Sequence, residues 1–187
     1  MIPIILKLKK NVHKDITKAQ DMIVEELYGV FEKAVLHGGT SIWRCYHGNR
    51  FSEDIDVYLP RDINKINTLF ERFKKRGFSI TKKKIGKNSL FSILQLNRVV
   101  VRFEAVFKKV KGSLKEYENA ESNFITVYTL TPEELIQEKV NAYLQRRKIR
   151  DLYDIFFLLR YIKDNNRIKV VLKKLINNFK FPVDEKD

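Results

Sequence analysis

The chain has little cysteine and no long apolar run. Cys45 is the single cysteine among 187 residues, which excludes an internal disulfide and a cysteine-based metal cluster. No run of about 18 apolar residues occurs, so no transmembrane helix is predicted. The apolar start Met1–Leu6 lacks the basic leader and the small-residue cleavage site of a signal peptide. We therefore expect a cytoplasmic protein with no membrane segment.

Acidic residues are also scarce relative to basic ones. Aspartate and glutamate total 23 against 37 lysines and arginines, which gives a net charge of +14. Such a balance predicts an acidic partner, either nucleic acid, a nucleotide or an acidic protein. A lysine-rich, cysteine-poor composition is also typical of thermophile proteins, so charge alone does not decide between these interpretations. Zinc-ligand spacing, a Walker loop, internal repeats and coiled-coil heptads are missing from the sequence.

Hydrophobic periodicity predicts an α+β chain. We expect helices over residues 15–33, 41–47, 63–76, 132–147, 150–162 and 168–179. We expect strands over residues 34–36, 55–59, 90–96, 98–107 and 124–130, with a further strand opening at 78–80. Residues 108–123 are charged and without a period, which indicates a loop between lobes. We therefore divide the chain into a domain over residues 1–128 and a helical lobe over residues 129–187.

The stretch from His37 to Leu59 carries the densest chemical signal. A short apolar strand ends at Gly38-Gly39, where paired glycines let the backbone turn tightly and approach a ligand. Thr40 can cap the helix that follows, and the free N–H groups at such a helix start suit a phosphate. The stretch therefore begins as a phosphate-binding turn.

Two aspartates lie on the next strand of the same stretch. Ile55 and Val57 point into a core, so Asp54 and Asp56 point the other way, about 7 Å apart along the strand. Neighbouring carboxylates raise each other's pKa unless a cation lies between them. Oxygen ligands at this spacing suit Mg²⁺ or Mn²⁺. The alternative is a hairpin end that carries two solvated aspartates.

Three further groups of charged residues stand out. Glu104 lies in an apolar strand, where a carboxylate is costly without a partner; a salt bridge to Arg102 or Lys108 would provide one. Lys139 lies within the apolar stripe of its helix with no carboxylate three or four residues away. An inward lysine of this kind often meets a ligand phosphate, although it could also extend past the core to solvent.

Asp151 and Asp154 lie one turn apart near the start of the following helix. The i,i+4 pairs Arg147–Asp151 and Arg150–Asp154 offer a structural explanation for both acids. In the functional interpretation, one acid orients Lys139 or the acceptor of a transfer reaction.

The motif as a whole resembles the polymerase-β-type nucleotidyltransferases, and within them the AbiEii toxin family, the toxin half of two-gene antiphage systems. The residues that carry the resemblance are Gly38, Gly39, Thr40, Arg50, Ser52, Asp54 and Asp56. The Lys-x-x-Ala of the family matches Lys139 to Ala142, and its Arg-Asp-x-x-Asp-Ile matches Arg150 to Ile155. The resemblance covers roughly residues 19–159. Relatives place a third acid beside the Asp-x-Asp strand, and Glu104 is the sole acid between Glu71 and Glu116.

The resemblance implies a polymerase-β-like fold with a mixed sheet flanked by helices, a small C-terminal helical lobe, and a set of site roles. Asp54, Asp56 and Glu104 would bind two Mg²⁺ (or Mn²⁺) ions, with Glu104 also able to take the acceptor proton. The residues that would bind the phosphates of the nucleotide are Gly38, Gly39, Thr40, Ser52, Arg50 and Lys139. Lys139 and Asp151 would also take part in catalysis, and Asp154 would take part in nucleotide binding.

The resemblance also implies transfer of a nucleoside monophosphate from an NTP to an acceptor, with RNA, in particular a tRNA 3′ end, the first candidate. Basic segments over residues 72–87, 108–115 and 146–150 fit such an acceptor. A cognate antitoxin protein is a possible partner. Two other functions stay open: an aminoglycoside-type nucleotidyltransferase that modifies a small molecule, and a non-catalytic module that binds nucleotide or RNA.

Overall fold

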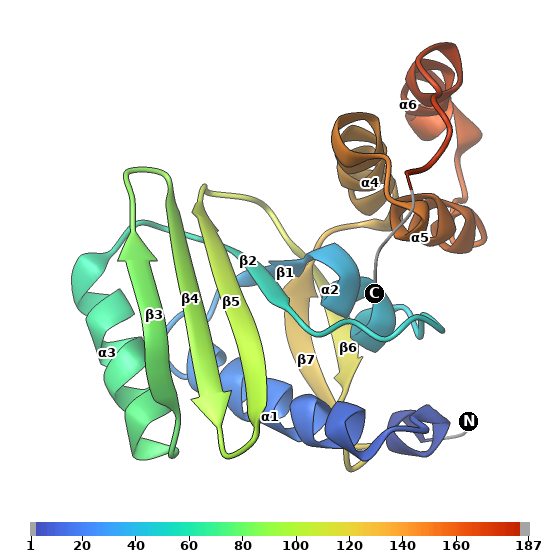
Figure 1. Ribbon diagram of the computed structural model, residues 1–187. Coiled ribbons are helices and arrows are strands. Elements are labelled where there is room, and N and C mark those ends of the chain that lie inside the picture. The colour runs from blue at the N-terminus through green and yellow to red at the C-terminus, as the bar shows by residue number, and fades with distance from the viewer. Residues whose placement is uncertain (1–2, 184–187) are drawn as a thin grey trace. The chain divides into compact units, whose positions relative to one another are not determined.

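The computed structural model describes residues 3–183, and the chain divides into two compact units between Thr129 and Leu130. Figure 1 shows the sheet of unit 1 and the helices of unit 2. Unit 1 begins with a 3₁₀ turn, Ile4–Lys7, and contains α1 (Asn11–Tyr28), α2 (Gly38–Cys45) and α3 (Ile63–Lys75). Within the described residues no helix is long and apolar enough to cross a membrane.

Unit 1 is built on a mixed sheet, which confirms the expected fold class. Over the described residues the sheet has seven strands in the order β3-β4-β5-β2-β1-β7-β6. The strands are β1 (Val35–His37), β2 (Ile55–Leu59), β3 (Ser79–Ile85), β4 (Ser89–Leu96), β5 (Val99–Phe107), β6 (Ser113–Glu118) and β7 (Phe124–Thr129). The pairs β2–β5 and β1–β7 are parallel, and the other neighbours are antiparallel.

Strand alternation in the centre of the sheet separates a core face from a polar face. Ile55, Val57 and Leu59 of β2 are fully buried. Phe103 of β5 is equally buried and meets Phe73 of α3 edge to face, with ring centroids 5.7 Å apart. Because successive residues of a strand point to opposite faces, the residues between these apolar ones point away from α3. The even-numbered positions of β2 and β5 therefore share the polar face.

Several helix boundaries and one loop differ from the sequence-based expectations. α1 spans Asn11–Tyr28 instead of residues 15–33, and α2 begins at Gly38 instead of residue 41. The expected loop over residues 108–123 contains β6, which pairs with β7 along its whole length. Edge strands tolerate charged residues, and the charges of β6 hid its period from a hydrophobicity pattern.

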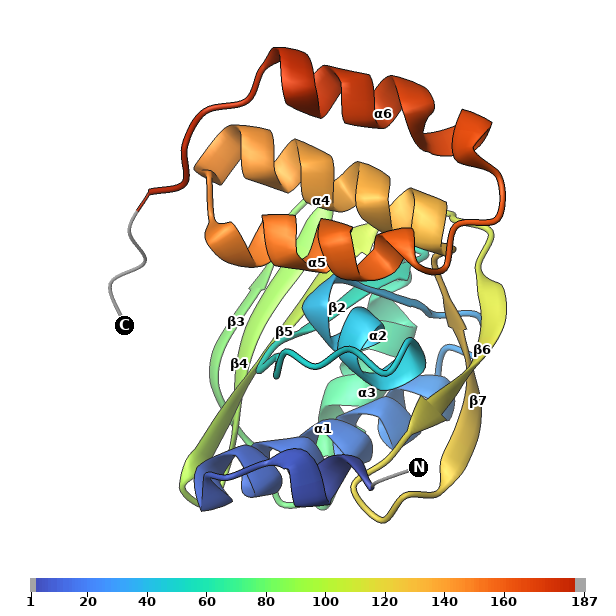
Figure 2. The same ribbon diagram turned by 90° about the vertical axis from the view of Figure 1, so that its right-hand side faces the viewer.

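Unit 2 consists, over its described residues, of three helices. These are α4 (Pro132–Arg146), α5 (Ile149–Leu159) and α6 (Asn165–Asn177), and α4 packs against both others, as Figure 2 shows. The expected capping box at the start of α4 is confirmed, because Thr131 and Glu134 each bond the other's backbone N–H. The helix expected over residues 150–162 ends earlier, because α5 ends at Leu159; Ile155, Phe157 and Leu158 are buried, whereas Phe156 is 73% exposed.

Candidate functional site

The two predicted acids Asp56 and Glu104 lie directly opposite each other in the sheet. Parallel pairing of β2 with β5 aligns Asp56 with Glu104, and both side chains are partly exposed on the polar face. Asp54 lies one residue before β2, on the same face as Asp56. Sheet register therefore brings all three predicted metal ligands to one edge of the polar face.

The neighbouring carboxylates at this edge of the sheet affect each other's ionisation. Burial raises the pKa of Glu104, and the nearby Asp56 carboxylate raises it further, while Arg102 opposes the rise. A raised carboxyl pKa means that the ionised form is disfavoured where it stands. A cation bound between Asp56 and Glu104 would reverse this penalty.

Asp54 already has a cationic partner. The Arg102 guanidinium donates from Nε to Asp54 Oδ1 at 3.0 Å and from Nη2 to Asp54 Oδ2 at 2.7 Å. Arg102 Nε also lies 3.6 Å from Glu104 Oε1, so one of the partners considered for Glu104 is present. Arg102 is 48% exposed. It lies two residues before Glu104 on β5, which places both on the polar face.

The carboxylates fit a hard divalent cation by donor type, since all of them are oxygen ligands. Among residues 3–183 no three histidine, cysteine or acidic side chains lie in metal-binding geometry. At this edge the Asp54 carboxylate is bonded to Arg102. Asp56 and Glu104 lie opposite each other in the register of β2 with β5.

A glycine turn lies beside these acids. Gly38 has φ +70°, a conformation that favours glycine, and a Cβ on Gly38 would overlap the Asp56 carboxylate. A Cβ on Gly39 would lie 2.6 Å from Ser52 Oγ and 2.8 Å from an Arg50 Nη. The lack of a side chain at the two glycines therefore lets Asp56, Ser52 and Arg50, all predicted from the sequence, approach the backbone of this turn closely.

Thr40 has a different role from the predicted one. α2 starts at Gly38 after His37, so Thr40 is inside the helix and does not cap it, and the prediction of a Thr40 cap is wrong. The Thr40 hydroxyl donates to the Asp54 carbonyl oxygen, and Thr40 is 1% exposed. Thr40 therefore holds the chain at Asp54, and this bond engages the hydroxyl that was expected to reach a phosphate.

Two supporting residues were not predicted from the sequence. Gln20 of α1 is fully buried and donates from Nε2 to the Ser52 carbonyl oxygen at 2.9 Å. His37 stacks on Tyr58 with ring centroids 4.2 Å apart, and register places His37 opposite Asp56. Gln20 could have been predicted as a buried polar residue, because it lies next to the apolar stripe of its helix in the sequence.

Unit 2 contains a buried cluster of charges. Lys139 Nζ of α4 lies 2.7 Å from Asp154 Oδ2 and 3.6 Å from Asp151 Oδ1 of α5. All three side chains are at most 8% exposed. Arg146 donates from Nε and Nη2 to the two oxygens of Asp151, each at 2.7 Å. The sequence-based view that Lys139 has no carboxylate partner within its own helix holds, but α5 supplies two.

The alternative explanation of Asp151 by an ion pair with Arg147 is wrong, because the arginine that bonds Asp151 is Arg146. Arg147 has φ 52° and ends α4 in a left-handed conformation. This turn brings α5 back beside α4, so that Asp154 reaches Lys139. An acid that orients Lys139 was one of the sequence-based interpretations, and the contact between Asp154 and Lys139 fits it.

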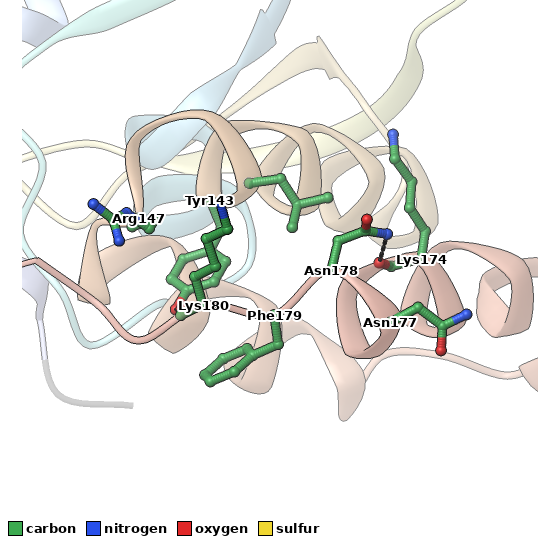
Figure 3. A pocket seen from close by; sticks show the side chains of 8 residues that line it. Tyr143, Arg147, Lys174, Asn177, Asn178, Phe179 and Lys180 are labelled. Carbon is green, nitrogen blue, oxygen red and sulfur yellow. Dashed lines mark hydrogen bonds between the residues drawn. The ribbon is translucent and has the colours of Figure 1, made fainter.

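Unit 2 also has a basic cavity of about 500 Å³, shown in Figure 3. Arg147, Lys174 and Lys180 line it together with Asn177 and Asn178. Its aromatic wall is Tyr143 stacked on Phe179, with centroids 5.7 Å apart. The Tyr143 hydroxyl donates to the Lys180 carbonyl oxygen at 2.5 Å, which fixes the chain after α6 beside α4.

Comparison with known protein families gives one match to most of the chain. Residues 25–185 match the model of the family described as nucleotidyl transferase AbiEii toxin, type IV toxin–antitoxin system. The match includes the glycine turn, the acids of β2 and β5, and the charge cluster of unit 2. No curated protein is significantly similar in sequence.

Solved structures with the same fold include a nucleotidyltransferase toxin and an antibiotic-resistance factor. MenT4, a nucleotidyltransferase toxin of Mycobacterium tuberculosis, is 19% identical with a TM-score of 0.65, over 90% of this chain and 67% of its own. JHP933 of Helicobacter pylori is 22% identical with a TM-score of 0.63, over 89% and 78%. The antibiotic-resistance factor ANT(2″)-Ia is 12% identical with a TM-score of 0.54, over 86% and 92%. These similarities confirm the polymerase-β-like fold.

Proposed function

Because the chain belongs to the AbiEii family of nucleotidyltransferase toxins, we propose that it transfers a nucleoside monophosphate from an NTP to an RNA acceptor in a divalent-metal-dependent reaction. Nucleotidyl transfer itself follows from the family. The observation that carries the proposal is the placement of Asp56 and Glu104 opposite each other beside the Gly38-Gly39 turn. Carboxylates next to a glycine turn at the start of a helix, where backbone N–H groups can bind phosphate, are what such a transfer requires.

Asp56, Glu104 and Asp54 are the residues that would hold the metal. A bound Mg²⁺ or Mn²⁺ ion supplies Lewis-acid activation of the acceptor hydroxyl and charge neutralisation at the triphosphate. Asp54 can join the other two acids only if its carboxylate leaves Arg102. Glu104, which lies opposite Asp56, is a carboxylate that could accept the proton of the acceptor hydroxyl.

The glycine turn would hold the triphosphate. Gly38 and Gly39 place backbone N–H groups at the start of α2, in a triphosphate cradle where anions are favoured. Ser52 Oγ and the Arg50 guanidinium approach the same turn and can donate to phosphate oxygens. Thr40 contributes indirectly, because its hydroxyl positions Asp54. In this role Gln20 is a positioning residue, since it fixes the backbone at Ser52.

For Lys139 we propose phosphate contact, with Asp154 and Asp151 as the carboxylates that orient its ammonium group. The support is the pair of Lys139–carboxylate distances, 2.7 and 3.6 Å. The same contacts also stabilise the packing of α4 on α5, so the lysine has a structural contribution as well as the proposed one.

RNA as the acceptor is supported by charge. The chain carries a net charge of +14, and basic residues also line the cavity of unit 2. We propose a tRNA 3′ end as the acceptor and a cognate antitoxin as protein partner, in keeping with the toxin–antitoxin family.

Incubation with each labelled NTP, Mg²⁺ and total RNA tests this function. We expect the label of one or more NTPs to enter RNA, with release of pyrophosphate, and chelation by EDTA to abolish the reaction. Transfer should weaken steeply as salt rises, because RNA binding releases counterions. Label that enters aminoglycosides and not RNA, with salt-insensitive turnover, would replace the RNA acceptor by a small molecule.

A further inference from the structure

A cavity of about 530 Å³ lies in unit 1 beside the loop that precedes β2. It is lined by Lys7, Leu8, Lys9, Lys10, His13, Trp43, Gly48, Asn49 and Phe51. None of these lining residues is acidic. The cavity therefore combines positive charge with aromatic surface, a combination typical of sites for nucleotides.

The floor of the cavity is apolar and the rim is cationic. Trp43 and Leu8 are 3% and 9% exposed, and Phe51 packs against the cluster that they form with Ile4. Phe51 meets Trp43 edge to face at 4.8 Å and stacks on His13 at 4.1 Å between ring centroids. The three rim lysines are exposed. A planar base fits such a floor, while a phosphodiester backbone fits the rim.

The rim is electrostatically unfavourable in the protein alone. Lys10 immediately precedes α1, and over the described residues α1 has neither a side-chain cap nor an acid in its first turn. A lysine at a helix N-terminus is repelled by the positive end of the helix dipole. An anion bound between the lysines would offset this repulsion, and the cavity beside them provides the space for it.

The cavity shares a loop with the proposed triphosphate cradle. Phe51 faces the cavity, whereas the next residue, Ser52, places its Oγ against Gly39. Arg50, on the other side of Phe51, also borders Gly39. An occupant of the cavity would therefore lie one residue along the chain from the groups that are expected to hold the NTP.

We propose that this cavity binds a nucleotide unit of the single-stranded RNA acceptor, with the base against the half-buried rings of Phe51 and His13, beside the buried Trp43, and the adjoining phosphates on Lys7, Lys9 and Lys10. This inference rests on the proposed function, because it names the place where the proposed RNA acceptor binds. We favour RNA over a protein partner because a nucleic acid carries both a planar base, which matches the aromatic floor, and phosphates, which match the lysine rim.

The single tryptophan of the chain makes the test direct, because Trp43 lies in the floor of the cavity. A short single-stranded RNA should change Trp43 fluorescence saturably, in the absence of NTP and metal. The variant K7Q/K9Q/K10Q should bind this RNA more weakly in fluorescence anisotropy. In a plot of the logarithm of the RNA association constant against the logarithm of the salt concentration, the slope of the variant should be smaller in magnitude by about 2. Each phosphate of a single strand that a lysine neutralises contributes about 0.7 to this slope, and the variant removes three lysines.

The matched control is K33Q/K163Q/K169Q, which removes the same charge from exposed positions outside the cavity and outside the three basic segments. The control should keep the Trp43 response and most of the affinity. Equal reductions of affinity in the two triple variants would overturn the proposal, because they would indicate a diffuse charge effect. An unchanged Trp43 signal with bound RNA, or the same saturable signal with a mononucleotide alone, would overturn it too. The proposed function fails by a different observation, namely the absence of label transfer, which this binding assay does not measure.

Discussion

Arg102 and Asp54 form a two-point ion pair across the polar face of the sheet, at 3.0 and 2.7 Å. The same guanidinium lies 3.6 Å from Glu104. Arg102 therefore provides the positive charge that Asp54 and Glu104 would otherwise obtain from a divalent cation. Its own pKa is raised, chiefly by the hydrogen bond to Asp54, so it remains charged. If the proposed metal ion binds, Arg102 competes with it for the same carboxylates.

The first prediction follows from this competition. Arg102→Gln should bind Mn²⁺ more tightly than wild type, because Asp54 no longer has to leave a cationic partner. Titration followed by the rise in melting temperature with Mn²⁺ measures this without turnover. Arg98→Gln is the control, since Arg98 is an exposed arginine just before the same strand. An affinity for Mn²⁺ that stays the same or weakens in Arg102→Gln would disprove the competition.

The second prediction concerns the cradle at Gly39. Gly39→Ala places a Cβ 2.6 Å from Ser52 Oγ and 2.8 Å from an Arg50 nitrogen, so these side chains must move. Overpacking of this kind costs about 1–3 kcal/mol, and we expect NTP affinity to fall about tenfold or more, since tenfold is about 1.4 kcal/mol. Gly86→Ala, where a Cβ meets only ordinary contacts, should leave binding unchanged. Equal NTP affinity in both variants would place the triphosphate elsewhere.

The third prediction separates the structural and the phosphate-binding contributions of Lys139. Lys139→Met removes the ammonium group from Asp154 and Asp151, and removal of one partner of a buried pair typically costs about 3–5 kcal/mol. Urea unfolding should show this decrease in stability. The double variant Lys139→Met/Asp154→Asn should recover part of the stability, because the buried charge is removed as well. If the double variant regains stability but not NTP binding, the lysine contacts phosphate; if NTP binding returns with stability, its role is structural only.

The fourth prediction concerns pH. Burial raises the pKa of the Cys45 thiol from about 9 to about 12, so a thiol reagent at pH 8 should modify the protein only after unfolding. The unfolded state loses this proton above about pH 9, whereas the folded state keeps it until about pH 12. The contribution of Cys45 to stability is therefore complete below about pH 9 and decreases between about pH 9 and 12. Cys45→Ala should show a shallower decrease in this window, and rapid labelling of the folded protein would contradict the burial.

Sequence reasoning succeeded where local pattern decides the structure. The alternation around Asp54 and Asp56 correctly predicted β2, and Thr131 correctly predicted the start of α4. It failed where a partner comes from elsewhere in the chain. The acids that meet Lys139 come from α5, and β6 depends on pairing with β7. Neither contact leaves a periodic signal in its own segment.

Arg102 illustrates a subtler limit. The sequence placed Arg102 near Glu104, but its main contact is with Asp54, 48 residues earlier in the chain. Only the parallel register of β2 with β5 brings these two residues together. Thr40 was likewise identified as a polar residue of the site, yet its hydroxyl bonds the backbone of Asp54. Residue types were thus predictable, whereas their partners required the tertiary register.

The most direct test of Asp56 as a metal ligand is turnover by Asp56→Asn at saturating Mg²⁺ and NTP. Asparagine keeps the shape of Asp56 but removes its charge, so the variant should fold at least as stably as wild type without metal, since a neighbour that raises the pKa of Glu104 is removed. Mg²⁺ should raise its melting temperature much less than that of wild type. Transfer of labelled nucleotide should fall by several orders of magnitude, because charge stabilisation is the largest catalytic contribution. Turnover close to the wild-type rate would contradict the assignment of Asp56 as a metal ligand.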